Sequence, residues 1–109
     1  MNNLEYYKVF YHVARLGNLT AAARELNISQ PAVSQSIRQL ETSVGAKLFV
    51  RASKGVRLTG EGELLYHYVA KGYGQIELGE QKIRQMLNLE LGEIHIGASD
   101  MTLRFYLLL

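Results

Sequence analysis

The fold is decided by the stretch Thr20-Ala-Ala-Ala-Arg-Glu-Leu-Asn-Ile-Ser-Gln-Pro-Ala-Val-Ser-Gln-Ser-Ile-Arg-Gln-Leu40. It predicts two short helices joined by a tight turn at Asn27, because asparagine tolerates the left-handed backbone conformation better than most residues. Ser29 can cap the second helix, and Pro31 suits a first helical turn, where no intrahelical N–H is needed. The pair is typical of a helix-turn-helix, at about residues 18–37. The second helix should bury an apolar stripe at spacings of four, three and four: Val33, Ile37, Leu40 and Val44.

The opposite face of the second helix is polar and carries a single charge. It presents Gln30, Ser34 and Arg38 on one row, and Gln35 and Thr42 on the adjoining row. Amides, hydroxyls and guanidinium groups bond base edges in the major groove of DNA, whereas an ordinary solvated helix face is rich in Glu and Lys. This face therefore favours nucleic-acid recognition. A helical hairpin without a DNA partner is the alternative, because short motifs match loosely.

A small β-hairpin is predicted directly after the helix-turn-helix. Lys47-Leu-Phe-Val-Arg51 alternates as a short strand, residues 52–55 form a turn, and Val56-Arg-Leu58 forms a second strand. This arrangement is typical of the wing of a winged helix. A basic hairpin suits contact with phosphates, although Lys and Arg also protect the edges of ordinary solvated hairpins. Its basic residues are Lys47, Arg51, Lys54 and Arg57, with no acidic residue between Glu41 and Glu61.

Charge is distributed unevenly along the chain. Residues 1–59 contain eight Lys or Arg and three Glu, a net charge of +5, whereas residues 60–109 contain four Lys or Arg and seven acidic residues, a net charge of −3. A DNA-facing module followed by a segment that does not face DNA predicts this asymmetry. Composition alone would also suit an anionic membrane surface, but the polar face of the second helix favours DNA.

Length and composition exclude several other classes. The 109 residues suffice for one small domain and the start of another. The sequence has no cysteine, which excludes disulfides and cysteine-ligated zinc. It has no signal peptide and no apolar run near the roughly twenty residues that a membrane helix needs. We therefore expect no membrane association, and the cytoplasm is the default location.

A long helix is predicted over residues 60–91. Thr59 can cap it, and Glu61 and Glu63 in its first turn favour the positive end of the helix dipole. Its first two turns are expected to pack against the winged domain, but beyond Gly72 too little other chain remains to cover its apolar stripe. Glycines in a helix cost about 0.8–1 kcal/mol each relative to alanine but allow another helix to approach closely, so self-association is favoured. The stripe forms a heptad seam: Leu65, Val69, Gly72, Ile76, Gly79, Ile83 and Met86.

The pattern changes again after Gly92. Residues 93–98 alternate like a strand, and residues 99–102 look like the start of a helix. A lone strand and half a helix cannot form a domain. We therefore expect residues 92–109 to be the truncated start of an α/β domain.

Five segments match a known family pattern: Leu19-Thr-Ala-Ala-Ala-Arg-Glu-Leu26, Ser29-Gln-Pro-Ala-Val-Ser34, Ile37-Arg-Gln-Leu-Glu41, Gly45-Ala-Lys-Leu-Phe49 with Arg51, and Val56-Arg-Leu-Thr59 with Gly62. Together they resemble the N-terminal region of LysR-type transcriptional regulators over essentially the whole chain. The resemblance implies a mainly α-helical fold, with a winged helix-turn-helix over residues 1–59 and a linker helix that dimerises antiparallel. It also implies a homodimer, or a tetramer of the full-length protein, that reads an imperfect inverted repeat in double-stranded DNA and regulates transcription.

The resemblance further implies a C-terminal effector domain of the periplasmic-binding-protein type, with Gly92-Glu-Ile-His-Ile-Gly97 as its first strand. Ser99 and Thr102 would then lie near the edge of its small-molecule pocket. Most of that pocket is absent from this sequence. A small-molecule effector is therefore expected to bind only through the missing C-terminal domain.

The family pattern also implies which residues contact DNA. Many members carry Arg where this chain has Gln35. Because Arg favours guanine whereas Gln pairs best with N6 and N7 of adenine, the operator is expected to differ at that position. The base-facing residues would be Gln30, Pro31, Ser34 and Gln35, and the phosphate-facing residues Thr20, Arg38, Arg51, Lys54 and Arg57.

An enzyme is the competing class. The three histidines, His12, His67 and His95, lie on three separate predicted elements, where each is more typical of a surface residue than of a ligand or base. The sequence shows no nucleophile elbow, phosphate loop or clustered carboxylate pair. We therefore expect no catalytic residue, no metal site and no cofactor.

Overall fold

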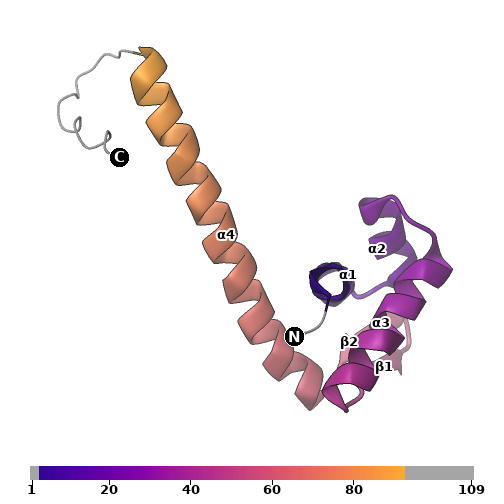
Figure 1. The fold of residues 1–109 in the computed structure, drawn as a ribbon. Helices are drawn as coiled ribbons and strands as arrows, with labels where there is room; N and C mark the ends of the chain where they lie inside the picture. Colours follow the sequence, from indigo (N-terminus) through magenta and orange to yellow (C-terminus); the bar gives the residue numbers. More distant parts are fainter. Residues whose placement is uncertain (1–2, 93–109) are drawn as a thin grey trace. The chain divides into compact units, whose positions relative to one another are not determined.

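The computed structural model describes residues 3–92. Three helices come first, α1 (Leu4–Leu16), α2 (Leu19–Leu26) and α3 (Gln30–Val44), followed by strands β1 (Phe49–Ala52) and β2 (Gly55–Leu58) and the long helix α4 (Gly60–Gly92) (Figure 1). The chain up to Lys71 forms one unit and the chain from Gly72 a second, which are described in turn. The predicted strand at 93–98 and the predicted effector residues Ser99 and Thr102 lie outside the described residues.

The ends of the two helices in the helix-turn-helix follow the local sequence. The hydroxyl of Ser29 accepts a hydrogen bond from the N–H of Ala32 at 3.2 Å and caps α3, with Pro31 in the first turn. Asn27 ends α2 in the left-handed conformation, with a φ of 62°. The predicted turn and the predicted cap are therefore confirmed.

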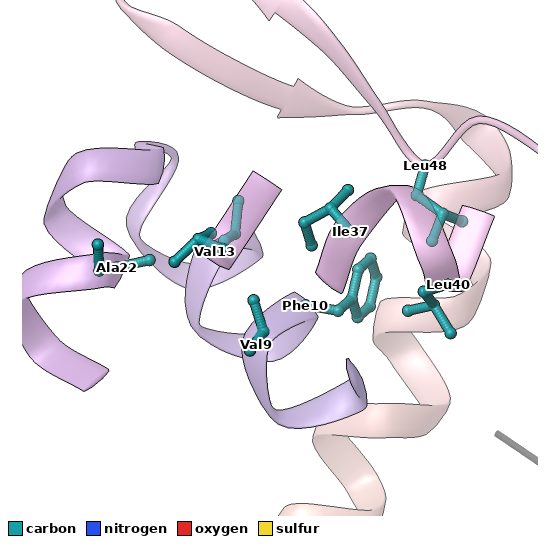
Figure 2. Packing of buried hydrophobic residues seen from close by; sticks show 9 residues of the cluster. Val9, Phe10, Val13, Ala22, Ile37, Leu40 and Leu48 are labelled. Atoms are coloured by element: carbon teal, nitrogen blue, oxygen red, sulfur yellow. The ribbon is translucent and has the colours of Figure 1, made fainter. Parts of the chain in front are cut away.

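The core lies among α1, α2 and α3. Val33, Ile37 and Leu40 are buried as predicted, and Figure 2 shows the last two beside Phe10 of α1. Val44 is 41% exposed, so the prediction that it completes the buried stripe is wrong. It is the last residue of α3, and the chain turns away at the next residue, which is a left-handed glycine. The full set of buried apolar residues is Val9, Phe10, Val13, Ala22, Ala23, Val33, Ile37, Leu40 and Leu48.

The wing is an antiparallel hairpin of β1 and β2 (Figure 1). β1 begins two residues later than predicted, so Lys47 and Leu48 precede the strand. The reason is that Leu48 belongs to the core, and its N–H bonds to Oε2 of Glu41 at 2.8 Å rather than to the neighbouring strand. β2 begins at Gly55, one residue earlier than predicted.

The first turns of α4 belong to the winged unit. The hydroxyl of Thr59 accepts a hydrogen bond from the N–H of Gly62 at 2.9 Å, so its predicted role as the cap is confirmed. Leu65, Tyr66 and Val69 are partly buried against the core. The prediction that the start of this helix packs on the winged domain is therefore confirmed.

From Gly72 onward α4 continues as a helix. Except for the half-buried Tyr73, its side chains are exposed as far as Leu89, with Ile76 at 60% and Ile83 at 58%. Among the residues that the structure describes, no helix is both long enough and apolar enough to cross a membrane. The apolar stripe of this unit is open.

Candidate nucleic-acid interface

The outer face of α3 is defined by the packing of its inner face. Because Val33, Ile37 and Leu40 point into the core, the opposite side of the helix is left to solvent. Pro31, Gln35, Arg38 and Thr42 are exposed, whereas Gln30 and Ser34 are half-buried at the edge of this face. Nε2 of Gln30 donates to the hydroxyl of Ser34 at 3.2 Å. On α3, the structure therefore places three predicted contact residues, Pro31, Gln35 and Arg38, on open surface and two, Gln30 and Ser34, in a mutual hydrogen bond.

Thr20 lies at the start of α2 and is exposed. The side chain of Asn18 caps this helix by accepting a hydrogen bond from the N–H of Ala21 at 2.8 Å. No acidic residue lies in the first turn of α2, so nothing there opposes the positive end of the helix dipole. That end of α2 suits an anion such as a phosphate.

The basic residues of the wing are exposed but do not share one face. Arg51 pairs with Val56, and Arg57 pairs with Val50. Since adjacent residues of a strand point to opposite faces, the two arginines leave the hairpin in opposite directions. Lys54 lies in the turn between the strands. A single flat surface would therefore meet Lys54 together with one of the two arginines.

One acidic residue of the winged unit, Glu25, is held by two neighbours. Oε1 of Glu25 lies 2.6 Å from Nη2 of Arg15 and 2.6 Å from Nδ1 of His12. These hydrogen bonds, first from His12 and then from Arg15, hold the pKa of Glu25 below its usual value. The hydrogen bond to Glu25 in turn raises the pKa of Arg15. The negative charge of Glu25 is thus matched locally by the positive charge of Arg15.

The sequence did not indicate what holds the wing in place. The N–H of Val56 donates to the C=O of Gly17 at 3.0 Å, and a Cβ on Gly55 would lie 2.2 Å from that same oxygen. At the other end, Glu41 accepts hydrogen bonds from the backbone of Leu48 at 2.8 Å and of Phe49 at 3.4 Å. The signals available in the sequence were Gly17, Gly55 and the acidic Glu41, which precedes the basic segment of the wing. Their partners lie too far along the chain for a local pattern to pair them.

The part of the chain that the structure describes holds no group of three or more His, Asp or Glu residues arranged to bind a metal ion. His12 is bonded to Glu25 on α2, and His67 lies on α4.

Comparison with known proteins agrees with this geometry. Residues 4–63 match the family model described as bacterial regulatory helix-turn-helix protein, lysR family. The chain is 39% identical over 97 residues to the transcriptional regulator BudR of Klebsiella aerogenes, covering 89% of this chain and 68% of BudR. It is 36% identical over 94 residues to the regulator CfxR of Cupriavidus necator, covering 86% of this chain but 30% of CfxR. The chain belongs to the LysR family of bacterial regulatory helix-turn-helix proteins.

Solved structures support the same assignment. The DNA-binding domain of BenM in complex with its catB site 1 DNA is 29% identical, with a TM-score of 0.70 over 79% of this chain and 97% of that one. Full-length CbnR in complex with its target DNA is 28% identical, with a TM-score of 0.65 over 76% of this chain and 29% of that one. The predicted winged helix-turn-helix with a long C-terminal helix, and the predicted family, are therefore confirmed.

Proposed function

We propose that this chain is the DNA-binding and pairing part of a transcriptional regulator. Residues 1–59 would form the DNA-binding domain, residues 60–91 the linker helix, and residues 92–109 the start of an effector domain. The observation that carries the proposal is the exposed outer face of α3, which offers amides, a hydroxyl and a guanidinium while its inner face is packed in the core. Relatives named as transcriptional regulators and neighbours solved on DNA support it.

The exposed residues divide by chemistry into two groups. Gln35 has an amide that can donate and accept at once, as adenine requires in the major groove, and Pro31 lies one turn before it. Gln30 and Ser34 would join them after exchanging their mutual hydrogen bond for contacts to a base. The phosphate-facing group would be Thr20, Arg38, Arg51, Lys54 and Arg57, whose hydroxyl and cationic groups hold the backbone without reading sequence.

The pairing surface would be the open stripe of α4. Leu65 and Val69 are partly buried against the winged core, so the far half of the seam would supply most of the contact. Nothing lies within 4 Å of a Cβ added at Gly72 or Gly79, so a second helix could approach these positions closely. The remaining seam residues, Ile76, Ile83 and Met86, are exposed. Two copies paired in this way would present two copies of α3 to an inverted repeat.

The remaining assignments rest on the family. The chain spans 30% of CfxR and 68% of BudR. By the family resemblance, a small-molecule effector would bind to a C-terminal effector domain, with Ser99 and Thr102 at the edge of its pocket. Higher assembly to a tetramer would belong to the full-length protein. We assign the chain no catalytic role.

The test is a binding titration on DNA. Fluorescence anisotropy of the 109-residue chain with a duplex selected by it from a random pool should show tight binding that weakens as salt rises, because bound Lys and Arg release counterions from DNA. A helical module that binds only protein would show no salt-dependent DNA affinity. That result would overturn the proposed function.

A further inference from the structure

The peptide of Leu48, where the chain enters the wing, is held from both sides. Its N–H donates to Oε2 of Glu41 in α3 at 2.8 Å, and its C=O accepts from the N–H of Thr59 at 3.0 Å. The hydroxyl of Thr59 also donates to the C=O of Lys47 at 2.7 Å. The side chain of Leu48 is buried in the core. The start of the wing is therefore attached directly to the helix that carries the base-facing residues.

Glu41 carries its negative charge at an electrostatically unfavourable place. It lies in the last turn of α3, where the helix dipole disfavours a negative charge, and its side chain is only 10% exposed. Its ion pair with Lys47, 3.4 Å between Nζ and Oε1, gives little stability because the lysine is 79% exposed. The two backbone N–H groups of Leu48 and Phe49 are its remaining partners. These two contacts account for a largely buried carboxylate at the end of α3.

We propose that Glu41 is a positioning residue for DNA binding. By holding the start of β1 against the end of α3, it sets where Lys54 and Arg57 lie relative to Gln35. This inference rests on the proposed function, because it assumes that α3 reads bases while the wing holds phosphates. It makes a prediction opposite to that of simple electrostatics. Removing a negative charge near bound DNA should strengthen binding, whereas removing this acceptor should weaken it.

Three substitutions separate the acceptor from the charge. Glu41→Gln keeps the length of the side chain and an acceptor oxygen but removes the charge. Glu41→Asp keeps the charge but withdraws the carboxylate by one methylene from the N–H of Leu48. Glu41→Ala removes both. The matched control is Glu63→Ala, which removes an exposed carboxylate from the first turn of α4 and leaves the wing untouched.

The measurement is the salt dependence of binding to the selected duplex, on the full 109-residue chain, with circular dichroism as the test of folding. In Glu41→Ala and Glu41→Asp, the fall of log K with log salt should be less steep by about 1.8, because the phosphate contacts of Lys54 and Arg57 are lost at about 0.9 each. Glu41→Gln and Glu63→Ala should not weaken binding. If Glu41→Ala fails to fold, the comparison of Glu41→Asp with Glu41→Gln decides.

A double-mutant cycle distinguishes positioning from a general loss of structure. Lys54→Ala with Arg57→Ala should lower the slope by about 1.8 in the wild-type chain and by less than about 0.5 in Glu41→Ala, because the displaced wing no longer reaches DNA. Equal decreases in both backgrounds would overturn the role of Glu41 while leaving the proposed function intact. A wild-type chain without salt-dependent binding would overturn both.

Discussion

Gly62 provides a direct test of how the wing and α4 are fitted together. It is buried in the first turn of α4, and a Cβ built on it would lie 2.1 Å from the C=O oxygen of Leu48 and 2.9 Å from Cδ2 of Leu58. The nearer atom is backbone, and it is already fixed by the hydrogen bond from the N–H of Thr59. Moving the side chain of Leu58 alone would therefore not make room for the added methyl group. Either α4 or the start of the wing must move.

We expect Gly62→Ala to destabilise the fold, against the trend for helices. Helix propensity alone would stabilise the protein by about 0.8–1 kcal/mol. Forcing a methyl group into a packed site typically costs about 1–3 kcal/mol, and a contact with backbone at 2.1 Å belongs at the upper end of that range. The net loss should be about 1–2 kcal/mol, or roughly 4–16 °C in Tm for a domain of this size.

The control lies in the same helix. Gly74 has nothing within 4 Å of an added Cβ and is not on the heptad seam, so Gly74→Ala should show the propensity gain alone. Urea and thermal unfolding of both variants, followed by circular dichroism, give the comparison. A Gly62→Ala protein as stable as wild type would refute the close approach of α4 to the wing.

Three further predictions concern the proposed function and its surroundings. Gln35→Ala should cost about 1–3 kcal/mol of binding free energy on the selected DNA site and relax the sequence preference at one base pair per half-site, whereas Lys54→Ala should weaken binding to all DNA sequences alike and lower the steepness of the salt dependence by about 0.9. Selection from a random DNA pool with each variant would contradict this if only Lys54→Ala altered the preferred sequence. Gly79→Leu should shift the chain toward monomer in analytical ultracentrifugation, since the bulk blocks a partner helix although helix propensity rises; an unchanged dimer would remove the glycine seam from the interface. Because the pKa of Glu25 is lowered in the folded state, its hydrogen bonds to His12 and Arg15 stabilise the protein above the usual carboxyl pKa, and this stability is lost as the pH falls through the lowered value. Glu25→Gln should therefore make the free energy of unfolding depend less on pH in the acid range. An identical acid dependence in both proteins would show that these hydrogen bonds do not contribute.

The sequence was sufficient to predict the helix-turn-helix because its signals are local. Asn27, Ser29 and Pro31 act through their own backbone or through groups a few residues away. The buried stripe of α3 followed from periodicity alone until Val44, where the prediction failed. The failure at Val44 has a tertiary cause. The apolar periodicity continues to the end of the helix, but burial requires a neighbouring element to pack against, and the chain leaves α3 at Gly45.

The parts that could not be predicted depend on long-range contacts. The start of β1 was misplaced because the N–H of Leu48 bonds to Glu41, seven residues away on a different element. The opposite directions of Arg51 and Arg57 depend on the register of the hairpin, and a shift of one residue would exchange their faces. The sequence therefore overstates how many basic side chains of the wing can contact one phosphate backbone at the same time. The register decides which of them act together.

The glycines of the two units differ in what surrounds them, and this difference bears on assembly. In the winged unit, a Cβ on Gly55 would lie 2.2 Å from the backbone oxygen of Gly17, and one on Gly62 would lie 2.1 Å from that of Leu48, so each glycine permits a contact within the chain. In the far half of α4, Gly72, Gly74 and Gly79 have nothing within 4 Å of an added Cβ. Together they lower helix propensity by about 3 kcal/mol. In the proposed dimer, a second helix that approaches closely along the seam would offset this loss, and this is the physical argument for placing Gly72 and Gly79 at the interface.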